Sequence, residues 1–162
     1  MIVVADTSAF NYLVQMGRAE ILHTLYGRVV IPHAVHDELL ALGAPRAVSA
    51  WATDLPHWVD VVSAMRIDFT LSELLGAGER EAISLAIEIS ANLVLMDDQP
   101  GRIAAEERGL IVSGTLFVLL QASRRRLLDF ESAIAELKSL GFRMSEAIEA
   151  TMRKRSNQGN LS

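Results

Sequence analysis

Residues 78–98 have the sequence GEREAISLAIEISANLVLMDD, in which a helical pattern is followed directly by a strand pattern. Five apolar side chains recur at helical spacing between residues 78 and 90: Ala82, Ile83, Leu85, Ala86 and Ile89. The apolar run at 92–96 has the length of a buried strand, and Asp97 and Asp98 follow it. This order predicts one unit of a parallel α/β sheet with acids at the carboxyl end of a strand.

The same alternation of short apolar runs and helical patterns extends through the rest of the chain. Strands are expected at 2–5, 28–31, 58–62, 92–96 and 110–112. Helices are expected from Ser8 as N-cap to Gly17, and at 18–26, 32–42, 45–52, 78–90, 102–108, 115–126, 130–140 and 145–155. The predicted fold class is α/β, a three-layer α/β/α arrangement with a central parallel sheet of about five strands and a helical C-terminal extension.

The length and apolar content predict a single domain. A chain of 162 residues, of which 51% are apolar, can bury one sizeable core. We expect this domain to cover 1–155, with a core at 1–125, C-terminal helices at 126–155 and a disordered tail at 156–162. No internal repeat or linker is evident, and Trp51 and Trp58 are expected to anchor the core or an interface.

The composition restricts the chemistry that is possible. The chain has no cysteine, which excludes thiolate metal sites and cysteine nucleophiles, so any metal must be bound by oxygen or imidazole. This favours hard ions such as Mg²⁺ or Mn²⁺. No run of eighteen apolar residues and no basic leader is present, so we expect a cytoplasmic protein.

The charge is distributed unevenly along the chain. Residues 1–123 carry seven Lys and Arg against fifteen Asp and Glu, whereas 124–162 carry eight against five, which together give the net charge of −5. The acidic part could hold metal and the basic part could hold phosphate. Solvated helix faces are an equally good explanation of the basic part. For the triplets Arg124-Arg125-Arg126 and Arg153-Lys154-Arg155 they are the preferred interpretation, and a role on RNA or an antitoxin stays open.

Acids follow two of the expected strands directly. Asp6 comes after the first strand, and Asp97 and Asp98 come after the strand at 92–96. Ligands of open parallel sheets bind beyond the carboxyl ends of the strands, where these acids would lie. A carboxylate at the end of a buried strand is costly unless it faces solvent, a cation or a donor. Two such positions in one sheet suggest a shared cation.

Further acids lie near the start of two helices. Glu79 is in the first turn of its helix, where the helix dipole favours an ionised carboxylate, and its spacing places it on the inward face. Glu81 shares its face with Ser84 and Glu88, which we expect to be the solvent side. On the helix at 32–42, periodicity does not decide between Asp37 and Glu38.

Each acid taken singly has a structural explanation as a helix-dipole partner or a turn residue. The set is harder to explain in this way, because crowded carboxylates repel each other and raise one another's pKa values. Such a cluster persists mainly where divalent ions neutralise it, and oxygen ligands are those that Mg²⁺ prefers. Divalent ions of this kind activate water and stabilise the charges of phosphodiester cleavage.

With these residues in place, the sequence resembles the PIN-domain ribonucleases and, within them, the VapC-like toxins of bacterial and archaeal toxin–antitoxin pairs. The matching pieces are 4–8 (VADTS), 36–40 (HDELL), 78–83 (GEREAI) and 94–98 (VLMDD). They cover roughly residues 1–125. The eighteen residues from Glu79 to Asp97 fit the family's spacing and select Glu79 over Glu81.

The resemblance implies a metal-assisted attack of water on an RNA phosphodiester, with Mg²⁺ or Mn²⁺ as cofactor. It assigns the catalytic and metal-binding roles to Asp6, Glu38, Glu79 and Asp97. Asp98 is an additional candidate ligand, Thr7 or Ser8 is expected to hydrogen-bond Asp6 or a metal-bound water, and Arg102 and Thr115 are weaker candidates for phosphate contact. Two features depart from the commoner family pattern: a Glu at 79 where Asp is usual, and Asp98 beside Asp97.

The resemblance also implies partners, namely RNA, a small antitoxin protein and a second copy of the chain. It favours the subgroup of PIN proteins with a Gly-Glu-Arg-Glu-Ala helix start and a Gly-Thr-Leu after the last strand. Two other functions stay open: a PIN fold that binds RNA or protein without cleavage, and a small-molecule phosphohydrolase with Asp6 as nucleophile.

A histidine site is a further alternative, because His33 and His36 lie one helical turn apart on the helix that also holds Glu38. Such a trio could bind zinc. It lacks a recognisable catalytic motif, so solvated or capping histidines are the preferred interpretation.

Overall fold

The computed structural model describes residues 1–159 of the chain. Two compact units are present, Met1–Thr115 and a second that begins at Leu116. The boundary between them lies before residue 125, where the sequence analysis placed the end of the core.

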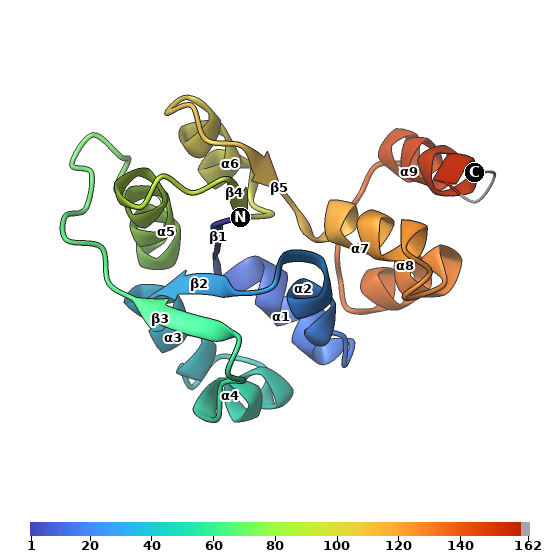
Figure 1. Ribbon diagram of the computed structural model, residues 1–162, viewed down its shortest axis with the longest axis horizontal. Helices are drawn as coiled ribbons and strands as arrows, with labels where there is room; N and C mark the ends of the chain where they lie inside the picture. Colours follow the sequence, from blue (N-terminus) through green and yellow to red (C-terminus); the bar gives the residue numbers. More distant parts are fainter. Residues whose placement is uncertain (160–162) are drawn as a thin grey trace. The chain divides into compact units, whose positions relative to one another are not determined.

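The first unit is built on a five-stranded parallel sheet with the order β3-β2-β1-β4-β5 (Figure 1). The strands are β1 (Val3–Ala5), β2 (Val29–Pro32), β3 (Val59–Val62), β4 (Leu93–Leu95) and β5 (Val112–Ser113). All five expected strands are present. In the register of the sheet, Val4 of β1 lies opposite Val30 on one side and Val94 on the other. The chain order reverses between β1 and β4, which is the switch point where parallel sheets bind ligands.

Six helices cover the sheet of this unit. They are α1 (Thr7–Gln15), α2 (Glu20–Tyr26), α3 (His33–Leu40), α4 (Arg46–Thr53), α5 (Ala77–Glu88) and α6 (Gln99–Glu106). The three-layer α/β/α prediction is confirmed. The largest differences in helix starts are at α1, α2 and α6. Asp6 and not Ser8 is the N-cap of α1, α2 begins at Glu20 and not at 18, and α6 begins at Gln99, because Pro100 is tolerated in its first turn.

Side chains of the strands alternate between two buried faces. Val4 and Val94 point to the face covered by α5 and α6, where they pack with Ile83 and Ala105 in one core cluster. The opposite face carries the neighbouring positions of the same strands and lies against α1 to α4 (Figure 1). Both faces are apolar, as a parallel sheet with helices on each side requires.

The two tryptophans belong to an aromatic cluster in this unit. Trp58 is 1% exposed and stacks with Phe10 at 6.4 Å between ring centroids, and Trp51 lies 4.9 Å from Phe10. The indole N–H of Trp58 donates to Glu20 Oε1 at 3.3 Å. Trp58 is therefore a core anchor, as expected.

The polar side of α5 does not face solvent as a whole. Glu81 is 8% exposed, and its two carboxylate oxygens accept hydrogen bonds from the backbone N–H groups of Ala34 (2.7 Å) and Ala64 (3.0 Å). The expectation that Glu81 lies on the solvent side is wrong. Periodicity identifies the polar face of a helix, but it does not show that another segment lies against that face.

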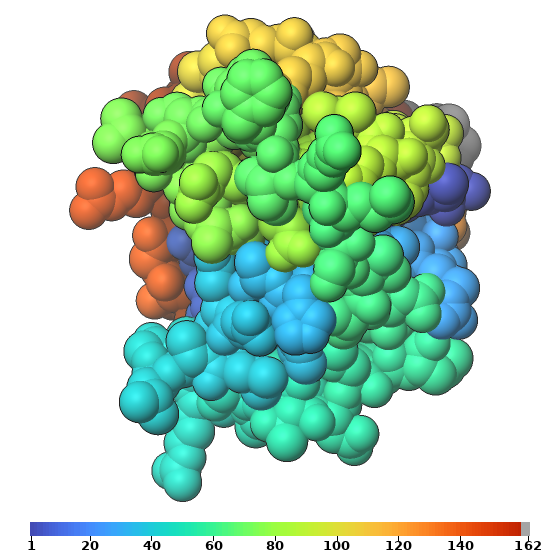
Figure 2. All heavy atoms as spheres, turned by 90° about the vertical axis from the view of Figure 1, so that its left-hand side faces the viewer, coloured from blue at the N-terminus to red at the C-terminus, as the bar shows by residue number. Residues whose placement is uncertain are grey.

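That segment is the stretch at 63–76 between β3 and α5, in green in Figure 2. Ser84 Oγ accepts from the backbone N–H of Asp68, and Glu88 accepts from those of Met65 and Arg66, all at 2.9 Å. The backbone of the segment is thus held by side chains of α5. Of its own apolar side chains, Leu71 and Leu75 are buried in the core, whereas Met65 (91%) and Phe69 (95%) are exposed.

The segment is also tied to the turn that follows α6 by an ion pair. Arg108 Nε donates to Asp68 Oδ2 at 2.7 Å, and both side chains are largely buried. The hydrogen bonds from Arg108 and Thr70 lower the pKa of Asp68 to about 2. The segment therefore keeps a defined path into α5.

The second unit contains three helices, α7 (Thr115–Arg124), α8 (Phe130–Ser139) and α9 (Glu146–Gly159). The expected end of the last helix at residue 155 is wrong, because α9 continues through Gly159. Ser156 is buried and its hydroxyl lies 3.2 Å from that of Ser123, so the last turn of α9 is packed against α7. The expected disordered tail at 156–162 is therefore helical as far as 159, and 160–162 lie outside the described residues.

None of the helices within residues 1–159 has the length and apolar character that crossing a bilayer demands.

Replacing Glu81 by Ala should lower the free energy of unfolding by about 1–3 kcal/mol, because two buried backbone N–H groups lose their acceptor. Urea denaturation at pH 7 measures the change. The matched control is Glu73→Ala, at an exposed position of the segment. Equal stabilities of the two variants would contradict the role assigned to Glu81.

Candidate active site

Asp6 lies at the carboxyl end of the central strand β1. Its backbone N–H donates to Leu95 O at 3.0 Å, and its Oδ1 accepts from the N–H (2.9 Å) and the hydroxyl (2.5 Å) of Ser8. The expected bond between Ser8 and Asp6 is therefore present. Asp6 is only 3% exposed, and burial, with smaller contributions from the charges of Asp97 and Glu79, raises its pKa to about 8.

Asp97 lies beside Asp6 at the end of β4. Its backbone N–H donates to Ser8 Oγ at 3.0 Å, so the Ser8 hydroxyl connects the ends of the two strands. The Asp97 side chain points to Thr115, whose N–H donates to Oδ1 at 2.7 Å and whose hydroxyl donates to Oδ2 at 2.6 Å. Burial raises the pKa of Asp97, and the Thr115 hydrogen bonds counteract the rise.

The two weaker candidates for phosphate contact have other roles. Thr115 is fully buried and uses both of its donors on Asp97, so it presents no free donor to a phosphate in this structure. Arg102 is half-buried, donates from Nη1 to Met96 O at 3.1 Å, and lowers the pKa of Asp97 through its charge. Both residues support the strand end that carries Asp97.

Glu38 is the acid of α3 that faces the site. Its Oε1 accepts from the backbone N–H of Gly78 at 2.9 Å, and its Oε2 accepts from the Thr7 hydroxyl. Asp37 is exposed and lies 3.5 Å from His33. The side chain of Glu38 also explains Gly78, because a Cβ there would lie only 2.8 Å from Glu38 Cδ.

Glu79 lies in the first turn of α5. Its Oε1 accepts from the backbone N–H of Gly76 at 3.2 Å, whereas its Oε2 is buried with no hydrogen-bond partner among the described residues. Burial raises the pKa of Glu79, and the charges of Asp98 and Glu38 raise it further. Close packing continues at Gly101, where a Cβ would clash with this carboxylate and lie 2.6 Å from Met96 Sδ.

A pocket of about 350 Å³ joins these side chains at the switch point of the sheet. Its walls are formed by Asp6, Thr7, Ser8, Asn11, Tyr12, Glu38, Glu79 and Asp98. The sequence analysis missed Asn11 and Tyr12, which lie one turn after Thr7 and Ser8 on α1 and were detectable by that i, i+4 spacing. Burial and the charges of Asp97 and Asp98 raise the pKa of Tyr12.

The acids are brought together but not into a preformed metal site. No group of three acidic or histidine side chains within residues 1–159 is close enough to hold an ion. The donor set nevertheless fits a hard divalent ion, because it offers carboxylate oxygens, raised pKa values and the unpartnered Oε2 of Glu79. Mutual repulsion holds carboxylates apart unless an ion neutralises them.

The structure separates the two adjacent acids of β4. Asp98 is exposed and lines the pocket, whereas both oxygens of Asp97 are bound by Thr115. From the sequence, Asp97 was expected to be a catalytic metal ligand and Asp98 an additional candidate ligand. The hydrogen bonds favour the reverse order for ligands.

The alternative zinc trio is not assembled. The Nε2 atom of His36 lies 2.9 Å from Ala52 O, and His33 lies beside Asp37 on the exposed side of α3. Glu38 points instead to Thr7 and Gly78. The two histidines are therefore structural or solvated, as preferred.

The sheet and its pocket define a three-layer α/β protein with a carboxylate site at the switch point. A family model described as a PIN domain matches residues 2–158, and the chain belongs to the PIN-domain family. PIN domains are generally nucleases, so this is a nuclease-type fold.

One similar solved structure is a PilT N-terminus domain protein from the hyperthermophilic archaeon Sulfolobus solfataricus P2. It is 23% identical, with a TM-score of 0.57 over 75% of this chain and 93% of the other chain, a likeness that concerns the fold. Among curated proteins, none matches the sequence. The VapC-like subgroup stays a prediction.

The buried carboxyl group of Asp6 should make the metal-free protein less stable as the pH rises from about 4 to about 8. In this window the unfolded chain carries an ionised Asp6, whereas the folded state keeps it protonated, so folding takes up a proton. Asp6→Asn removes this contribution and should be more stable than wild type at pH 8 by on the order of a few kcal/mol.

Urea denaturation in EDTA at pH 5 and pH 8 measures this difference. Asp37→Asn, at an exposed position, serves as control and should keep the wild-type pH dependence. If Asp6→Asn keeps it as well, Asp6 ionises normally in the folded protein.

Proposed function

We propose that this protein is a metal-dependent endoribonuclease that hydrolyses RNA phosphodiester bonds. The observation that carries the proposal is the pocket whose walls include Asp6, Glu38, Glu79 and Asp98, because these carboxylates come from four separate parts of a PIN-domain fold. Retention of so many partly buried acids at a switch point is costly for stability, and a functional requirement explains it.

Asp6, Glu38, Glu79 and Asp98 are the residues that would hold Mg²⁺ or Mn²⁺. A bound divalent ion supplies an acidified water and a positive charge for the phosphodiester oxygens. Asp97 is a positioning residue in this proposal, because its backbone N–H holds the Ser8 hydroxyl that binds Asp6. Thr7 positions Glu38 through its own hydroxyl.

Proton loss from Asp6 accompanies metal binding in this proposal. Since the pKa of Asp6 is raised to about 8, its carboxyl group is mostly protonated at neutral pH in the metal-free protein. A carboxylate must be ionised to serve as a ligand, so affinity for the ion rises with pH. Ser8 keeps Oδ1 of Asp6 in one orientation during this change.

Cleavage of a labelled single-stranded RNA should need added Mg²⁺ or Mn²⁺ and should fall about 100-fold or more in Glu38→Gln, because that carboxylate would no longer bind the ion. Gel analysis of the cleavage products measures the rate. Asp37→Asn is the matched control on the same helix and should keep wild-type activity, because Asp37 points away from the pocket.

The same assay separates the two acids after β4. Asp98→Asn should need more metal for half-maximal cleavage, whereas Thr115→Val, which removes the hydroxyl that binds Asp97 Oδ2, should lower the rate about 10-fold without that shift. Metal-dependent cutting that persists in Glu38→Gln would remove the carboxylate pocket from the mechanism.

A catalytically inactive PIN fold that binds RNA is the second candidate. The observation in its favour is that the described acids do not form a ready three-ligand group. In that case RNA would bind with the same affinity with or without metal and would remain uncut. The small-molecule phosphohydrolase has no specific support from the pocket.

We also infer a role as the toxin of a toxin–antitoxin pair, with a small antitoxin and a second copy of the chain as partners. The resemblance to VapC-like toxins supports this, and so do the exposed apolar side chains of the segment at 63–76, which include Phe69 (95%) and Leu74 (97%).

If an antitoxin exists, the product of a small neighbouring gene should co-purify with the tagged protein, and Phe69→Ser with Leu74→Ser should weaken this association about 10-fold or more. Pull-down followed by calorimetry measures it. Leu42→Ser, at another exposed leucine, is the control. Absence of any co-purifying product, together with a monomer in light scattering, would contradict both partner roles.

A further inference from the structure

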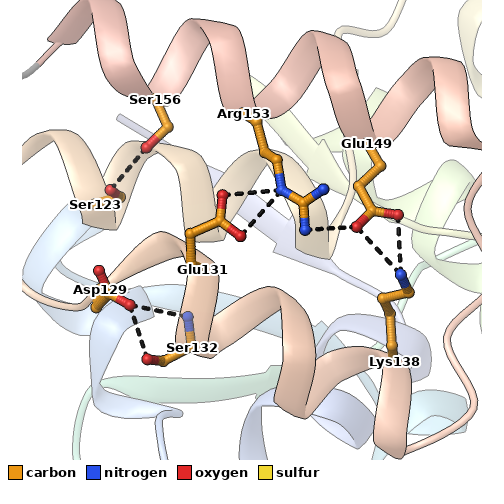
Figure 3. A network of polar contacts seen from close by, with 8 residues as sticks. All are labelled: Ser123, Asp129, Glu131, Ser132, Lys138, Glu149, Arg153 and Ser156. Carbon is orange, nitrogen blue, oxygen red and sulfur yellow. Dashed lines mark hydrogen bonds and ion pairs between the residues drawn. The ribbon is translucent and has the colours of Figure 1, made fainter.

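The ends of α7 and α9 bring together two basic triplets that are distant in the sequence. Ser123 Oγ and Ser156 Oγ lie 3.2 Å apart in a buried contact (Figure 3), and Arg124 Nη2 donates to Arg155 O at 3.4 Å. Four exposed side chains of these two triplets are here called the basic patch: Arg124, Arg126, Lys154 and Arg155. The packing of α9 on α7 brings together the chain segments that carry them.

Acids on the same helices do not neutralise the basic patch. Glu131 is paired with Arg153 at 2.8 Å, and Glu149 is paired with both Arg153 (2.8 Å) and Lys138 (3.0 Å), as Figure 3 shows. Asp129 caps the start of α8 with its carboxylate. Glu131 and Glu149 are therefore already engaged in ion pairs within the unit, and they take up Arg153 from the second triplet, whereas Asp129 is bound by the neutral Ser132.

The remaining cations have no such partner. Within the part of the chain that the structure describes, Arg126, Lys154 and Arg155 form no ion pair with an acid. Like charges gathered on one surface repel each other and destabilise the folded unit. An anionic partner that spans several cations would relieve this repulsion.

Arg126 occupies a backbone position that normally favours glycine. Its φ is +60°, and the N–H groups of Arg126 and Leu127 donate to the carbonyls of Ser123 and Ala122, both at 2.9 Å. This is the glycine-type end of a helix, where an L residue with a side chain is strained. A long cation held at such a position points to a role other than folding.

A pocket of about 300 Å³ lies beside Arg126. Asp129 and Glu131 also line it; Glu131 is paired with Arg153, whereas Asp129 is bound only by the neutral Ser132 and keeps its charge. The side chains of Arg126 and Asn157 supply the donors that no described hydrogen bond uses.

We propose that the basic patch docks the phosphate backbone of single-stranded RNA, outside the carboxylate pocket. Three of its four cations are arginines, whose planar guanidinium matches phosphate oxygens better than an ammonium does. A polyanion with regularly spaced charges neutralises several of these cations at once. The choice of RNA as the polyanion rests on the proposed nuclease function.

The test is fluorescence anisotropy of a labelled 20-nucleotide RNA at several KCl concentrations in EDTA, where no cleavage occurs. The variants are Arg126→Gly alone and together with Lys154→Gln and Arg155→Gln. Each lost phosphate contact should lower the slope of log affinity against log salt by about 0.7, hence by about two for the triple variant. Affinity near 0.1 M salt should fall about 10-fold or more.

Ser90→Gly is the matched control, because Ser90 also has a positive φ of 52° and is exposed, but carries no charge. Urea denaturation should show that Arg126→Gly and Ser90→Gly are each as stable as wild type or more stable. Only Arg126→Gly should lose affinity for RNA. Equal RNA affinity and salt slope in the triple variant and wild type would overturn the proposal.

Two further arms separate the alternatives. Patch-dependent binding of polyglutamate without binding of RNA would overturn the proposal in favour of an acidic protein partner. Metal-dependent cleavage by wild type is measured in parallel. If RNA binding depends on the basic patch but no cleavage is seen, the docking surface is supported and the nuclease proposal fails. If wild type cleaves RNA but the triple variant binds RNA as well as wild type does, the nuclease proposal is supported and the docking surface fails.

Discussion

The Ser8 hydroxyl links the carboxyl ends of β1 and β4, and the candidate site depends on this link. It donates to Asp6 at 2.5 Å and accepts from the Asp97 backbone at 3.0 Å. The two strands are neighbours in the sheet, so one side chain is enough to connect the residues that follow β1 with those that follow β4. Around this point the sheet order changes direction, which leaves a space that the acids surround.

The carboxylates fit into the site because the neighbouring glycines have no side chain. Gly78, Gly101 and Gly114 each lie so close to Glu38, Glu79 or Asp97 that a Cβ would collide with the acid. Where donors are available, as for Glu38 and Asp97, backbone N–H groups and threonine hydroxyls bind the oxygens. Ionisation is most costly at Asp6, because burial raises its pKa by more than the hydrogen bonds from Ser8 lower it.

Polar side chains organise both units through the same physical principle. In the first unit, Glu81 and Glu88 of α5 bind the backbone of the segment that leads into the site. In the second unit, Arg153 of α9 pairs with Glu131 of α8, and Glu149 of α9 pairs with Lys138 of α8. Because these acids bind partners inside their own unit, the cations of the basic patch have no acid paired with them. A chain with a net charge of −5 can therefore still present a basic patch.

Local pattern was enough to predict the five strands, the nine helices found within residues 1–159 and the acids Asp6 and Glu79, because periodicity and the order of elements are properties of neighbouring residues. The family resemblance was needed to prefer Glu38 over Asp37, and the family's spacing supported Glu79 over Glu81. Packing between distant segments decided the burial of Glu81, the contact of Thr115 with Asp97, the different surroundings of Asp97 and Asp98, and the helical turn at Ser156. A side chain's partner depends on which remote backbone reaches it, and that information arises only when the chain has folded.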